Sequence, residues 1–142
     1  MRTYYLFKIN NSFSKLYSSR TYYLYKILEQ ISLSSKNDFT MSYRLYEQIT
    51  IPYNKTSINS KLYRTYAFDN NYKKTLNKHT LDDGVEKTKL IVHNTYLKVK
   101  TNKNIISFFK ILCKEENIFV CDFNNKDYFW LNKAYNKSAC IN

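Results

Sequence analysis

The chain has 142 residues, of which 44% are hydrophobic, and this suits a single domain over residues 1–142 whose core needs neither disulfides nor a metal. The formal net charge of +12 favours an acidic partner such as nucleic acid, an anionic membrane or an acidic protein surface. A lysine-rich composition that serves solubility would give the same excess. Because the chain has only one glycine, glycine-rich phosphate-binding loops and the glycine-flanked serine elbow of hydrolases are excluded.

The N-terminal half is typical of one strand followed by three helices. The stripe that would face the core recurs at helical spacing and consists of Leu24, Ile27, Leu28 and Ile31. Pro52 marks the end of a later helix, because the residue before a proline is biased out of the α-helical region. Residues 69–83 are polar and give no clear prediction. The elements expected are a strand over residues 3–9, helices over 13–31 or 18–31, 39–50 and 56–68, and polar helix caps within 34–38.

The C-terminal half predicts strands separated by one helix. Leu90 and Val92 alternate with polar neighbours, as in a half-buried strand. The elements expected are two strands within residues 87–101, a helix over 103–114, and a hairpin that pairs 118–123 with 128–131 around an Asn-Asn-Lys-Asp turn. The whole pattern predicts an α+β fold: a mostly antiparallel sheet of about five short strands, with the N-terminal helices and one later helix packed on one side.

Candidate catalytic residues are few. His79 and His93 fall in different elements, and a lone histidine is more often structural than a proton-transfer group. Cys121 falls in an apolar strand, and the sequence places no base beside it. The three cysteines show no zinc-ligand spacing, and their odd number argues against a disulfide framework. We therefore expect a protein that is not an enzyme, with no catalytic or metal-binding residue and no cofactor.

No targeting or membrane signal is apparent in the sequence. The first residues, MRTYYLFKIN, lack the apolar region and the small-residue cleavage site of a secretory signal. No run approaches the roughly 20 apolar residues of a membrane span. We expect a cytoplasmic protein with no membrane contact.

Basic and aromatic residues interleave in two segments, residues 61–66 and 72–74. Lysine and arginine neutralise phosphates and aromatic rings stack on bases, so a small basic nucleic-acid-binding protein is one possible function. No helix-turn-helix, zinc-finger or RNP-type consensus is readable, which argues against direct nucleic-acid binding. Binding to phosphates should weaken steeply with salt, whereas binding through an apolar protein surface should weaken much less.

An aromatic stripe at the start of the first predicted helix exceeds what one buried helical face needs. Phe13, Tyr17 and Arg20 follow one another at i, i+4 and i+7, and this mixture is typical of protein interfaces. Leu45 and Gln48 of the next helix would extend the patch if the two helices pack side by side. The alternative is that Phe13 and Tyr17 only close the core.

Both ends of the chain carry recognisable residue patterns. They are Tyr4-Tyr5, then Phe13, Tyr17 and Arg20, then Ile49-Thr50 with Pro52, and finally Asp122-Phe123-Asn124 with Lys126 and Trp130-Leu131-Asn132. At these positions the chain resembles the sporulation inhibitor of replication family, the SirA proteins, over nearly its whole length. It departs from one example of that family at Lys133, where the example has proline, and at Ser19, where the example has glycine.

The resemblance implies a non-enzymatic regulator that binds the N-terminal domain of the replication initiator DnaA and inhibits initiation of chromosome replication during sporulation. It carries over Phe13, Tyr17 and Arg20 as partner-binding residues, with Leu45 and Gln48 from the following helix. It implies no small-molecule substrate. The terminal hairpin is expected to be a core element that marks the family, with Phe123, Phe129 or Trp130 buried.

Overall fold

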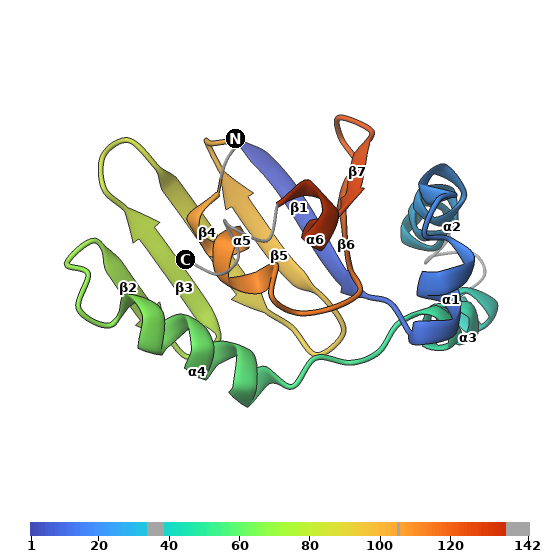
Figure 1. Ribbon diagram of the computed structural model, residues 1–142, viewed down its shortest axis with the longest axis horizontal. Helices are drawn as coiled ribbons and strands as arrows, with labels where there is room; N and C mark the ends of the chain where they lie inside the picture. The colour runs from blue at the N-terminus through green and yellow to red at the C-terminus, as the bar shows by residue number, and fades with distance from the viewer. Residues whose placement is uncertain (34–38, 105, 136–142) are drawn as a thin grey trace.

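The computed structural model describes residues 1–33, 39–104 and 106–135, so the expected caps within 34–38 lie outside the described residues. Seven antiparallel strands form one sheet in the order β2-β3-β4-β5-β1-β6-β7 (Figure 1). The strands are β1 (Arg2–Lys8), β2 (Tyr72–Thr75), β3 (Lys78–Asp82), β4 (Lys87–Val92), β5 (Leu97–Thr101), β6 (Ile118–Asp122) and β7 (Asp127–Trp130).

The helices fall into two groups in the chain, before and after the middle of the sequence. In Figure 1 the first three stand together beyond β6 and β7, whereas α4 lies along β2 and β3. An asparagine side chain caps the N-terminus of two of the helices. Asn10 accepts a hydrogen bond from the Phe13 amide at the start of α1, and Asn54 accepts one from the Ser57 amide at the start of α4. The helices are α1 (Asn11–Leu16), α2 (Thr21–Leu33), α3 (Phe39–Ile49), α4 (Lys55–Tyr66), α5 (Ser107–Leu112) and α6 (Leu131–Ala134).

Both faces of β1 are buried, each in a different core. Tyr4 and Leu6 point to one face and join residues of α4, α5 and α6, whereas Phe7 and Ile9 point to the other and join residues of α2 and α3. The fold class is therefore α+β as predicted. The expectation that the helices pack on one side is wrong, because alternate residues of β1 and β6 are apolar in both directions and each face needs its own cover.

The sheet has seven strands rather than about five because the segment 69–83 contains β2 and β3. Only Tyr72, His79 and Leu81 of these two strands are buried, so their hydrophobic alternation is weak. The long first helix is two helices, with Tyr17 to Arg20 between α1 and α2. The helix expected over 103–114 is shorter, since α5 begins at Ser107.

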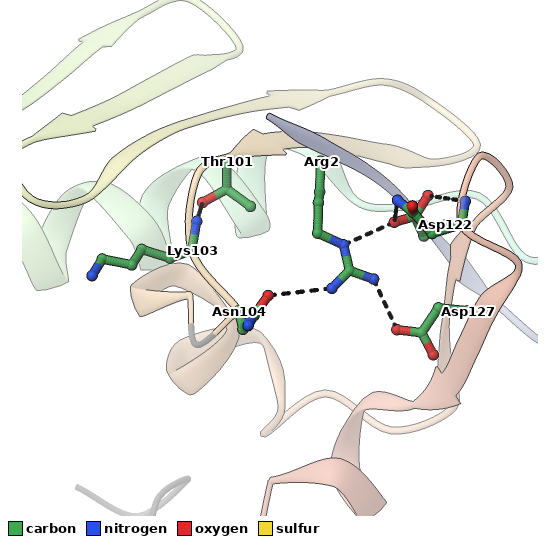
Figure 2. Close-up of polar contacts among 7 residues, drawn as sticks. Arg2, Thr101, Lys103, Asn104, Asp122 and Asp127 are labelled. Atoms are coloured by element: carbon green, nitrogen blue, oxygen red, sulfur yellow. Dashed lines mark hydrogen bonds and ion pairs between the residues drawn. The ribbon is translucent and has the colours of Figure 1, made fainter.

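The terminal hairpin is a core element, as expected, and Arg2 ties it to the first strand (Figure 2). The Arg2 Nε donates to Asp122 Oδ2 at 3.0 Å, and its two other nitrogens reach Asp127 at 3.0 Å and Asn104 at 3.3 Å. Asp122 is fully buried and also accepts from the backbone and the side-chain amide of Asn125. The Asp-Phe-Asn-Asn-Lys-Asp segment therefore holds a buried carboxylate at the tip of the hairpin.

Two further expectations concern the cysteines and the membrane. Cys121 is a buried free thiol, whereas Cys113 is disulfide-bonded. The odd number of cysteines led us to expect no disulfide framework, and that expectation is wrong for Cys113. No helix among the described residues is long and apolar enough to span a bilayer.

Candidate protein-binding face

The α1 helix presents the first two residues of the stripe as one stacked pair. The rings of Phe13 and Tyr17 lie 6.2 Å apart and are tilted by only 11°. Both are half-buried and pack at the margin of the core that α2 and α3 form with the sheet. Each ring therefore packs on the core with one part and is open to solvent with another.

Arg20 is exposed and stands at the bend before α2, beside a surface hollow of about 340 Å³. Because α2 continues the stripe at helical spacing, Tyr23 and Ile27 face the same hollow. The lining residues are Tyr17, Arg20, Tyr23, Lys26, Ile27 and Gln30. Lys26 is engaged by Glu29, whose carboxylate lies 2.8 Å from its ammonium group. Of the two cationic side chains that line the hollow, Arg20 is therefore the one that forms no ion pair among the described residues.

The α3 helix brings Leu45 and Gln48 into the neighbourhood of α1. The Asn10 side-chain amide, which precedes α1, donates to the Gln48 carbonyl, and the Asn10 backbone amide donates to Ile49 at 2.8 Å. Leu45 and Gln48 are both exposed and lie three residues apart, on one side of α3. We call Phe13, Tyr17, Arg20, Leu45 and Gln48 the stripe face.

Asn117 fastens α1 to the end of the sheet. Its carbonyl accepts from the Ile9 amide at 2.8 Å, its Oδ1 accepts from Ser14 Oγ at 2.7 Å, and its Nδ2 donates to Asn11 Oδ1 at 3.0 Å. It adopts a positive φ of 63°, a conformation that asparagine tolerates better than most residues. This anchor fixes the direction in which Phe13 and Tyr17 point.

The C-terminal end of the fold contacts the bend between α1 and α2. Lys133 donates from its ammonium group to the carbonyl of Ser18 at 3.0 Å, next to Ser19 in the bend between α1 and α2. In this chain the C-terminal end of the fold therefore supports the bend that carries Arg20.

The candidate catalytic residues His79, His93 and Cys121 each pack against other residues of the fold. His79 is fully buried between the Tyr72 hydroxyl at 2.6 Å and Asn59 Oδ1 at 2.7 Å, and burial lowers its pKa to about 4. His93 stacks on Tyr96 with ring centres 4.4 Å apart. Burial raises the pKa of the Cys121 thiol well above its usual value, which keeps it protonated and unreactive. Across the described ranges, no group of histidine, cysteine and acidic residues could hold a metal ion.

Sequence reasoning missed Tyr23, Ile27 and Gln30 as neighbours of the stripe. Tyr23 is 61% exposed, although it lies in a helix that packs against the core. The spacing of positions 20, 23, 27 and 30 could have revealed them, because it continues the series 13, 17 and 20. The bend at residues 17–20 obscured this continuity.

A stacked aromatic pair, an exposed arginine and a hollow beside them are features of a protein-binding domain. The chain belongs to the family described as sporulation inhibitor of replication protein SirA, which matches residues 2–134. The family identifies it as an inhibitor of replication associated with sporulation. No curated protein matches the chain.

Proposed function

We propose that the chain inhibits initiation of chromosome replication, without catalysis, by binding the N-terminal domain of the initiator DnaA through the stripe face. One observation supports this face above others: Phe13 and Tyr17 are stacked and only partly covered by the core, and Tyr17 and the exposed Arg20 line the same hollow. A stacked aromatic pair that is already held in place loses little conformational freedom on binding, and arginine is a common anchor of protein interfaces.

Each residue of the stripe face has a proposed role. Tyr17 inserts into an apolar groove of the partner, and Phe13 holds the Tyr17 ring in place by stacking on it. Arg20 pairs with an acidic residue of the partner, since its guanidinium is exposed and has no ion pair within the described part of the chain. Leu45 and Gln48 extend the contact along α3, where Gln48 lies beside the start of α1.

The net charge of +12 supports the same proposal at long range. A strongly positive protein is attracted to an acidic partner domain before any contact forms, which raises the association rate. The effect should appear as a salt-dependent association rate with a nearly constant dissociation rate.

Production of the chain in growing cells of its own host tests the proposed inhibition. We expect the ratio of origin to terminus DNA to fall, because fewer rounds of replication begin. The Tyr17→Ala variant should leave the ratio near that of cells without the protein. Tyr63→Ala is the matched control, since Tyr63 is 51% exposed on α4 and is not part of the stripe face. An unchanged ratio with the wild-type chain, or equal activity of Tyr17→Ala at equal abundance, would contradict the proposal.

A further inference from the structure

A second surface of the molecule collects lysines on one face of the sheet, away from the stripe face. Along β2 to β5, alternate residues point away from the core of α4 and α5, and none of them is fully buried. The buried residues beneath α2 and α3 come from β1, β6 and β7, so these helices do not cover this part of the sheet. The lysines on this face are Lys73, Lys78, Lys87, Lys89, Lys98 and Lys100, and we call them the lysine face.

The lysine face does not serve stability. Lys89 and Lys100 stand directly opposite each other on β4 and β5, and like charges in that position destabilise a sheet. Within the described part of the chain none of the six lysines forms an ion pair. The only acidic residue on the strands of this face is Asp82, opposite Lys87 at its edge. Six cations against one carboxylate match a partner that carries many regularly spaced negative charges.

An aromatic hollow adjoins the lysine face. It has a volume of about 600 Å³, within the usual range of small-ligand sites of about 300–1,000 Å³. The rings that line it are those of Tyr5, Phe7, Tyr43, Tyr46, Tyr96 and Phe123. Lys98 joins the two features, because its ammonium group lies 5.8 Å from the centre of the Tyr5 ring.

We propose that this surface binds single-stranded nucleic acid, with the phosphates along the lysine face and a base in the aromatic hollow. Lysines on neighbouring strands and at alternate positions are about 5–7 Å apart, so they form a two-dimensional array of cations. A cationic track next to aromatic rings is the combination that binds single strands without sequence preference. This mode of binding needs no recognition motif, so the missing consensus argues only against binding through a helix-turn-helix, zinc-finger or RNP-type module.

Two other anionic partners fit the surface less well. An acidic protein would match the lysines but would give no reason for an adjoining hollow lined by aromatic rings. An anionic membrane would favour several large apolar side chains between the lysines. The strands β2 to β5 place one there, since Ile91 stands between Lys78 and Lys98. Thr3 and Thr80 are the side chains opposite Lys100 and Lys89. The lysine face shares no residue with the stripe face, so this inference goes beyond the proposed function and can fail or hold independently of it.

Fluorescence anisotropy with a labelled single-stranded DNA of about 16 nucleotides tests the inference. Affinity should fall steeply with salt. The double variant Lys89→Gln, Lys100→Gln should lose about tenfold in affinity, and its salt slope should shrink by about 1.4, or about 0.7 for each lost phosphate contact. The matched control is Lys110→Gln, Lys114→Gln, which removes the same charge from exposed positions at α5 and just after it and should bind as the wild type does.

The aromatic hollow has its own variant. Tyr96→Leu should weaken binding while the salt slope stays unchanged, because it removes stacking and no charge. Thermal melting separates these effects from misfolding, since Lys89→Gln, Lys100→Gln relieves repulsion and should melt no lower than the wild type. If Lys89→Gln, Lys100→Gln does melt lower, Lys73→Gln, Lys78→Gln on β2 and β3 takes its place with the same expectation.

Three results would overturn the inference. They are no binding of the single strand at low salt, an equal loss in the control pair, and tighter binding to the matching duplex or to vesicles of anionic lipid than to the single strand. An equal loss in the control would mean that net charge alone attracts DNA.

Discussion

Arg2 and Asp122 join the first strand to the last hairpin through a partly buried ion pair. Burial alone would raise the pKa of Asp122, but hydrogen bonds from Asn125 and Arg2 outweigh it and hold the pKa below its usual value. A carboxyl with a lowered pKa stabilises the fold above its unfolded pKa of about 3.9. This stabilisation is therefore complete at neutral pH and is lost as the pH falls below about 4.

Arg2→Ala should lower the free energy of unfolding by about 2–3 kcal/mol, because it leaves the buried Asp122 carboxylate without its cation. Urea unfolding at neutral pH measures the loss. Asp127→Asn is the control, since the Asp127 side chain is 47% exposed and its pair with Arg2 should contribute less than about 1 kcal/mol. Equal losses in the two variants would show that burial of Asp122 is not the cause.

His79 is held neutral by its surroundings. The Asn59 side chain donates to Asn77, so its Oδ1 faces the ring and accepts from Nε2, while Nδ1 accepts from the Tyr72 hydroxyl. Burial, with a smaller contribution from the positive charge of Lys74, lowers the pKa to about 4. The unfolded chain takes up the proton near pH 6.5 and the folded chain does not. Stability should therefore fall as the pH drops from about 6.5 to 4.

His79→Gln should reduce this pH dependence by up to about 3 kcal/mol between pH 6.5 and 4, which corresponds to a pKa difference of about 2.5 at 1.36 kcal/mol for each unit. The pKa of His93 is also lowered, first by burial and then by Lys98 and Lys55, and that contribution remains in both proteins. Urea unfolding at several pH values gives the two curves. Parallel curves would contradict the assignment.

At the scale of single elements, α1 has too few residues to be stable alone and depends on its attachments. Asn117 provides two side-chain hydrogen bonds to α1, and its positive φ suits glycine equally well. Asn117→Gly should therefore keep the backbone of the turn and loosen the helix.

We expect Asn117→Gly to change the free energy of unfolding by no more than about 1–2 kcal/mol, because the side-chain hydrogen bonds lost contribute about 1 kcal/mol each and glycine relieves the left-handed conformation. Binding to the initiator domain should weaken severalfold, since Phe13 and Tyr17 would lose their fixed direction. Comparison of calorimetric binding with urea unfolding separates the two effects. Unchanged binding would mean that the orientation of α1 does not matter.

Most elements lie where the sequence predicted them, including α4 and β5, whose apolar periodicity is weaker than that of the others. The first strand, α3, α4, β4, β5 and the closing hairpin lie where apolar residues recur at strand or helix spacing. The strands β2 and β3 were missed because one of their faces is the lysine face, which left few apolar residues to detect. The bend between α1 and α2 was missed because no proline or glycine marks it.

The sequence proposed Phe13, Tyr17 and Arg20 as partner-binding residues from a surplus of aromatic residues, and that role stays a prediction. The sequence did not show how α1 is joined to α3 and to the sheet, because the contact of Asn10 with Gln48 and the anchor at Asn117 join segments far apart in the chain. Long-range contacts of this kind follow from the sheet order, with β1 between β5 and β6. No local pattern predicts that order.

At the scale of the whole molecule, the two proposed interactions use different residues. The initiator domain would bind the stripe face, and single-stranded nucleic acid would bind the lysine face. The positive charge behind the net +12 is therefore unevenly distributed between the two faces. Arg20 is the one cation of the stripe face, whereas the lysine face has six lysines. An initiator domain bound at the stripe face would leave the lysine face open.

Calorimetric titration of the chain against the isolated N-terminal domain of its host's DnaA, at physiological salt, tests the central claim most directly. The account predicts saturable binding that Phe13→Ala and Tyr17→Ala each weaken by about 2 kcal/mol or more, about 30-fold in Kd, while Tyr63→Ala leaves it unchanged. No heat from folded wild-type protein, or full affinity in a folded variant that lacks both Phe13 and Tyr17, would contradict it.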